Sequence, residues 1–145
     1  MIGIIKETFS IKEVNRLEEL SKTKDLCLFT DSPLPPVETT NLSLSPTSRS
    51  FNFTGVLIST CYKTTEVLLL NKSTKKKMFY AGNLEWVTSK KIPYEKLLSL
   101  YCNPKIRLVA STANVYNDIS TFFKKPEAVI EDWDLDKIKE IFKNV

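Results

Sequence analysis

The sequence predicts an α/β protein: a single three-layer Rossmann-like domain, residues 1–145, with a mostly parallel sheet of about five strands. Three observations support this prediction. The chain has 145 residues, the usual length of one domain. Hydrophobic residues make up 42% of it, which is typical of a soluble globular chain. From residue 55 onward, short apolar segments alternate with segments of helical periodicity, and this alternation indicates parallel strands joined by right-handed crossovers.

The first thirty residues contain one predicted helix and one predicted strand. Ser10 and Glu13 match a capping box, in which the N-cap hydroxyl and a glutamate at the third helical position each accept a hydrogen bond from the other residue's backbone N–H. Apolar residues then recur every three positions, so residues 10–23 are predicted to form an amphipathic helix. Leu26–Thr30 is short and apolar and is followed by Asp31-Ser-Pro, which indicates a buried strand.

Residues 31–54 are predicted to form a long loop rich in proline, serine and threonine. The segment holds four of the seven prolines of the chain, and only Leu42–Ser45 suggests a short extended piece. A loop of this length in a compact domain is usually functional or mobile. We therefore expect it to be mobile or to lie against the carboxyl edge of the sheet.

The rest of the chain alternates between strands and helices. The predicted strands are Gly55–Ser59, Lys77–Ala81, Ile106–Ala110 and Ala128–Ile130. Residues 61–71 are ambiguous, but the gap between two parallel strands needs a crossover, so a helix is predicted there. Further helices are predicted over 93–102, over 115–123 and after Asp134, which is placed to cap the last one.

Composition argues against several classes of function. The chain has no histidine, which removes the commonest general base and metal ligand. Its three glycines cannot build a P-loop or a dinucleotide-binding fingerprint. The three cysteines, Cys27, Cys61 and Cys102, fit no zinc module, and the carboxylates of residues 131–136 are better explained as helix caps than as metal ligands. We therefore expect no cofactor and no metal.

Cysteines expected to be reduced and the lack of an export signal suggest a cytoplasmic protein. The formal net charge is +4, below that of a dedicated nucleic-acid binder, so nucleic acid is not an expected partner. The N-terminal apolar run is too short for a signal peptide or a membrane span. A lysine cluster at Lys72, Lys75–Lys77 and Lys90-Lys91 either binds phosphate or is a solvated turn.

Polar residues at the ends of the predicted strands form the candidate site, because ligands of parallel sheets bind beyond the carboxyl ends of the strands. Trp86 could stack on a sugar or base while Glu85 accepts a hydrogen bond. Ser111 and Thr112 begin a helix whose free N–H groups could hold a phosphate or carboxylate. We expect these four residues to line one pocket. The alternatives are a tryptophan packed on the sheet edge and an ordinary helix cap. The strand ends considered are Thr30-Asp31, Ser59-Thr60, Gly82–Trp86, Ser111-Thr112 and Glu131-Asp132.

Phe53–Phe142 resembles a known family. The residues behind the resemblance are Gly55–Ser59, Lys77–Trp86, Tyr94, Ile106–Thr112 and Ala128–Asp132. They resemble a family of short uncharacterised proteins of large tailed bacteriophages, including cyanophages, which is itself similar to the N-terminal Rossmann-like half of GT-B glycosyltransferases. Leu84-Glu85-Trp86 matches the family pattern. Ala81-Gly82-Asn83 departs from it, and Ser111-Thr112 and Val115 replace an Arg-Ser and a His that the family often carries.

The resemblance implies a fold more directly than an activity. It implies a small phage-encoded binding or accessory protein without catalysis of its own, in the cytoplasm of an infected cell, with a host or phage protein or a sugar- or phosphate-bearing ligand as its partner. One alternative is a glycosyltransferase-like enzyme that needs a dimer or a partner chain for the donor half, with Glu85 or Asp31 as base. Another is a virion or assembly component.

Overall fold

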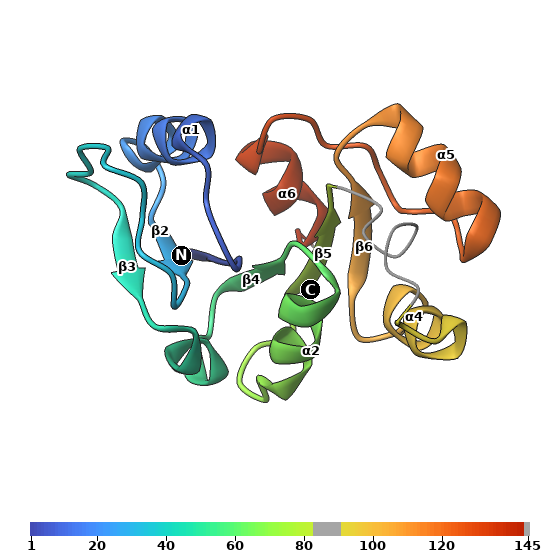
Figure 1. The fold of residues 1–145 in the computed structure, drawn as a ribbon. Helices are drawn as coiled ribbons and strands as arrows, with labels where there is room; N and C mark the ends of the chain where they lie inside the picture. The colour runs from blue at the N-terminus through green and yellow to red at the C-terminus, as the bar shows by residue number, and fades with distance from the viewer. Residues whose placement is uncertain (83–90, 144–145) are drawn as a thin grey trace.

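The computed structural model describes residues 1–82 and 91–143 and confirms the α/β architecture. Six parallel strands form one sheet in the order β3-β2-β1-β4-β5-β6 (Figure 1). This is the strand order of the Rossmann fold, in which the chain builds one half outward from β1 and then returns to build the other. The strands are β1 (Ile2–Ile5), β2 (Leu26–Phe29), β3 (Ser43–Ser45), β4 (Val56–Ser59), β5 (Lys77–Ala81) and β6 (Arg107–Ala110).

Helices cover both faces of the sheet, which makes it the middle of three layers. The core on one face contains residues of α1 and α6, and the core on the other contains residues of α2, α4 and α5. Each helix lies where the sequence predicted one, and Ser10 and Asp134 cap α1 and α6 as expected. No described helix has the length and apolar character needed to cross a membrane. The helices are α1 (Ile11–Ser21), α2 (Tyr62–Leu70), α4 (Tyr94–Tyr101), α5 (Ala113–Phe122) and α6 (Leu135–Ile141).

The central strand, β1, is not among the strands predicted from the sequence. It pairs with β2 on one side and with β4 on the other. Gly3 lies in its middle, where an added Cβ would come within 2.7 Å of the Phe29 ring and 3.1 Å of the Phe53 ring. The glycine therefore leaves the space in which Phe53 packs onto the centre of the sheet.

Residues 31–54 contain more regular structure than the predicted loop. The extended piece at Leu42–Ser45 contains β3, which pairs with β2 and extends the sheet sideways. A 3₁₀ helix, η1 (Thr47–Asn52), then contacts α2, β1 and β2 on the way to β4. The first residues of the segment follow β2 at the carboxyl edge of the sheet. The rest adds the edge strand β3 and connects it to β4.

Residues 128–130 form a single bridge in place of the predicted strand. Val129 pairs with Ala110, whose N–H donates to Ala128 O at 3.0 Å and whose carbonyl accepts from Ile130 N at 2.9 Å. The pairing ends there because the chain turns at Asp132 and Trp133, which both have positive φ.

Glu18 fastens the proline-rich segment to α1. Its Oε1 accepts hydrogen bonds from Thr40 N and Asn41 N, both at 2.8 Å, and its Oε2 accepts one from Leu42 N at 3.2 Å. Desolvation raises the pKa of this carboxyl, but the hydrogen bonds from residues 40–42 outweigh it and lower the pKa to about 2.

The anchoring of this segment should therefore depend on acid. A carboxyl whose pKa is lower in the folded state than its usual 4.5 stabilises the fold above pH 4.5, and this stabilisation is lost as the pH falls toward 2. Thermal unfolding between pH 2 and 6 should show a smaller acid-dependent fall in melting temperature for Glu18→Gln than for wild type. Glu19→Gln, which changes the exposed neighbouring carboxylate, is the control and should behave as wild type. Identical pH profiles for Glu18→Gln and wild type would contradict the anchor.

Candidate functional site

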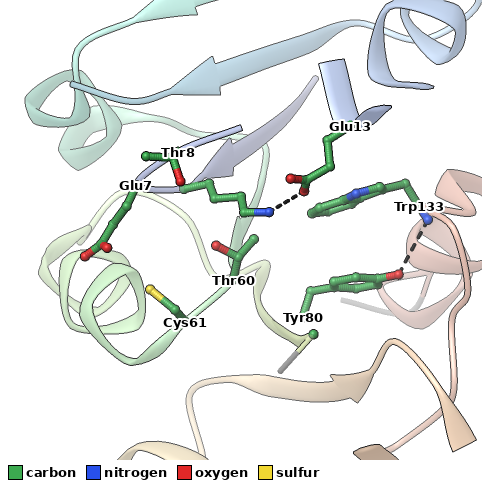
Figure 2. Close-up of a pocket in the computed structure, with 9 residues that line it drawn as sticks. Glu7, Thr8, Glu13, Thr60, Cys61, Tyr80 and Trp133 are labelled. Atoms are coloured by element: carbon green, nitrogen blue, oxygen red, sulfur yellow. Dashed lines mark hydrogen bonds and ion pairs between the residues drawn. The ribbon is translucent and has the colours of Figure 1, made fainter. Parts of the chain in front are cut away.

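A pocket of about 350 Å³ opens at the carboxyl edge of the sheet, between the ends of β1 and β4 (Figure 2). The two halves of the sheet diverge from these strands, and ligands of doubly wound sheets bind at this point. We call it the switch pocket. Its lining residues are Lys6, Glu7, Thr8, Glu13, Thr60, Cys61, Tyr80, Gly82 and Trp133.

The β1 side of the switch pocket is built around an ion pair. β1 ends at Ile5, and Lys6 follows directly and forms an ion pair with Glu13 in the first turn of α1. The other oxygen of Glu13 accepts a hydrogen bond from Ser10 N at 3.1 Å, while Ser10 Oγ accepts one from Glu13 N. In a dinucleotide-binding Rossmann domain, this helix terminus binds the pyrophosphate. In this chain the carboxylate of Glu13 takes part in capping the start of α1.

The β4 side is also closed by the chain's own hydrogen bonds. Thr60 Oγ1 donates to Ile5 O at 3.1 Å and so ties the ends of the two strands together. Cys61 N donates to Thr64 Oγ1 at 3.0 Å, and Cys61 Sγ accepts from Thr64 N at 3.5 Å. Cys61 and Thr64 thus form a reciprocal cap at the start of α2.

Tyr80 and Trp133 form the aromatic wall of the pocket. Their rings are stacked, with centroids 4.5 Å apart and an interplanar angle of 14°. Tyr80 OH donates to Ile130 O at 2.5 Å, and burial raises the pKa of this phenol, which favours the protonated donor. Arg16 Nε donates to Asp132 O at 3.2 Å and holds the turn that carries Trp133.

The chemistry of the switch pocket suits a small polar ligand without a large net charge. Lys6 and Glu13 neutralise each other, and the carboxylate of Glu7 lies 3.9 Å from the ammonium of Lys63. The threonines Thr8 and Thr60 supply hydroxyl groups. Among residues 1–82 and 91–143 there is no group of three or more Cys, Asp or Glu side chains placed to hold a metal ion.

The sequence-predicted site residues fall into two groups. Glu85 and Trp86 lie outside the described residues. Ser111 follows β6, and its N–H donates to Ala81 O at 3.0 Å. It therefore lies next to Gly82, where a side chain would meet Ser111 Oγ at 3.8 Å. Thr112 Oγ1 accepts a hydrogen bond from Val115 N at 3.2 Å and so caps α5. This is the ordinary helix cap that was the alternative to an anion-binding helix start. A common pocket for the four residues stays a prediction.

Sequence analysis identified part of the switch pocket. Thr60 and Gly82 were among the expected strand ends, and both line it. Lys6, Glu7 and Thr8 were missed because the strand before them was missed. An apolar run directly before a capping box is typical of the first strand and helix of a βαβ unit, and this pattern could have identified them.

We compared the chain with protein-family models, curated proteins and solved structures, and none of the three comparisons gave a match.

Proposed function

We propose that the chain is a binding protein without catalysis of its own and that its switch pocket takes a small neutral sugar. The observation that supports this most is the carboxylate of Glu13, which forms an ion pair with Lys6 and lies beside the stacked rings of Tyr80 and Trp133 (Figure 2). An ammonium and a carboxylate donate to and accept from neighbouring hydroxyls, and aromatic side chains pack against the apolar C–H surface of a sugar ring. The volume, about 350 Å³, is at the small end of the range for ligand sites.

A phosphorylated ligand fits the switch pocket less well. Anions bind at helix N-termini through free N–H groups. At the start of α1, Glu13 places a carboxylate beside those groups, and at the start of α2, Cys61 and Thr64 cap each other. A phosphate would have to displace these caps and approach the charge of Glu13.

The other functions suggested by the sequence resemblance stay predictions. These are a phage origin, a glycosyltransferase-like activity with a partner chain, and a role in a virion or its assembly. Asp31, one of the two candidate bases, has a structural role because its Oδ1 accepts from Thr47 N at 3.0 Å at the start of η1. Glu85, the other, lies outside the described residues.

A thermal-shift panel of neutral monosaccharides and nucleotide sugars tests the proposal. A ligand that binds only the native state raises stability by about 2.7 kcal/mol at 100 times its Kd. We expect at least one neutral sugar to raise the melting temperature of wild type, and we expect Glu13→Gln to lose most of that rise. Glutamine also satisfies a capping box, so this variant keeps the helix start while removing the charge.

Glu19→Gln is the matched control, because it removes a carboxylate of the same helix that is 65% exposed and outside the pocket. It should retain the sugar-induced rise. The proposal would be overturned by the absence of a rise with any neutral sugar, or by an equal rise in wild type and Glu13→Gln. A rise with nucleotide sugars alone would instead favour the glycosyltransferase-like alternative.

A further inference from the structure

A second pocket, of about 570 Å³, lies at the opposite, amino-terminal edge of the sheet. The end of α2 and the first residues of β5 and β6 surround it, so it is separate from the switch pocket and independent of the function proposed for it. We call it the basic pocket. Its lining residues are Leu69, Asn71, Lys72, Thr74, Lys75, Lys77, Pro104, Lys105 and Arg107.

Positive charge dominates the basic pocket. Five of its nine lining residues are cationic, and none is a carboxylate. Arg107 forms an ion pair with Glu127 at 2.8 Å. Within the described part of the chain, no ion pair involves the other four, which leaves four positive charges around one cavity without a matching anion. Like charges brought together in this way repel each other, and a bound anion would relieve the repulsion.

Lys77 is the strongest sign that the pocket is more than a solvated turn. The residue is only 7% exposed, and its ammonium donates to Asn71 O. Burial lowers the pKa of Lys77, and the charge of Lys105 lowers it further. A buried ammonium is costly unless it is paired. Within the part of the chain that the structure describes, the Asn71 carbonyl is the one acceptor for this ammonium, which leaves two of its three N–H groups to bind an anion.

The turn that carries these lysines is held rigidly. Asn71 is 1% exposed, and its Nδ2 donates to Ser50 O at 2.7 Å and to Phe53 O at 2.9 Å. Its Oδ1 accepts from Ser73 N at 2.7 Å and Thr74 N at 3.0 Å. The backbone between α2 and β5 is therefore fixed before any ligand arrives, which reduces the entropy lost on binding.

We propose that the basic pocket binds a compact anion that carries two or more phosphate groups. Four unmatched cations call for an anion of several charges, and their position around one pocket of about 570 Å³ favours a compact one. The lining contains no aromatic residue. Proteins that bind single-stranded nucleic acid usually stack the bases on aromatic side chains, so an extended strand is the less suitable ligand.

Isothermal titration of the full chain with inorganic tripolyphosphate at low salt tests this site. We expect binding that weakens as salt is added, since the contacts are charged and partly exposed. A Lys75→Gln/Lys105→Gln variant should bind at least about tenfold more weakly, equivalent to about 1.4 kcal/mol. Both side chains are exposed, so this variant leaves the buried Lys77 and its hydrogen bond to Asn71 O in place.

Lys12→Gln/Lys139→Gln is the matched control, because it removes the same charge from exposed positions on α1 and α6. It should bind tripolyphosphate like wild type. Absence of binding at low salt, or equal weakening in the two double variants, would overturn the proposal.

Two further ligands identify the source of the phosphates. ATP binding more tightly than tripolyphosphate would indicate a nucleotide, and equal affinity would indicate recognition of the phosphates alone; either result supports the site. A single-stranded oligonucleotide that binds more tightly than both would overturn the proposal in favour of a nucleic acid.

Discussion

Asn71→Ala should lower the free energy of unfolding by about 3 kcal/mol or more, because a buried polar group that loses its partner costs about 1–3 kcal/mol. The side chain makes four hydrogen bonds, two as donor and two as acceptor. Alanine would remove the hydrogen-bond donor of the Ser50 and Phe53 carbonyls. It would also remove the acceptor of the Ser73 and Thr74 N–H groups. Chemical denaturation with urea would measure the loss.

Asn117→Ala is the control for this change. Asn117 is exposed on α5, where alanine is the better helix former, so its replacement should be neutral or slightly stabilising. A loss at Asn71 no larger than that at Asn117 would show that water replaces the four hydrogen bonds and that the turn is not held by this side chain.

The parts of the fold that local sequence determines were predicted well. The α1 helix has its own capping box at Ser10 and Glu13, and α6 has its own cap at Asp134, so each could be predicted without knowledge of its neighbours. β1 was missed because its apolar run was considered only as a signal peptide or a membrane span, although β2 and β4, which are buried along their whole length in the same way, were predicted from similar runs. Its central place depends on pairing with β2 and β4, which no short segment reveals.

The candidate site shows the same limit. Thr60 and Gly82 could be named from the ends of predicted strands, but a pocket requires knowing which ends are neighbours. Lys6 meets Glu13 seven positions later, and Tyr80 meets Trp133 across more than fifty. The basic pocket could be anticipated only as a lysine cluster, since Lys105 and Arg107 join it through the pairing of β5 with β6.

Trp133→Ala should cost about 3–5 kcal/mol of folding free energy, the usual range for a buried tryptophan. The side chain is 7% exposed and stacks on Tyr80 at the wall of the switch pocket. Trp133→Phe should cost less, because a smaller ring can still pack on Tyr80. Denaturation of the three proteins followed by far-ultraviolet circular dichroism gives the comparison without relying on tryptophan fluorescence.

The backbone at this position provides a sharper test. Trp133 has φ 54°, and the preceding Asp132 has φ 49°. A left-handed residue other than glycine costs about 1–2 kcal/mol, so the packing of the tryptophan must offset that strain. Glycine usually destabilises a regular element by about 0.5–1 kcal/mol relative to alanine. Here Trp133→Gly should be at least as stable as Trp133→Ala, since both lose the ring but only glycine relieves the strain. A glycine variant clearly less stable than the alanine variant would mean that the left-handed turn does not carry the strain inferred for it.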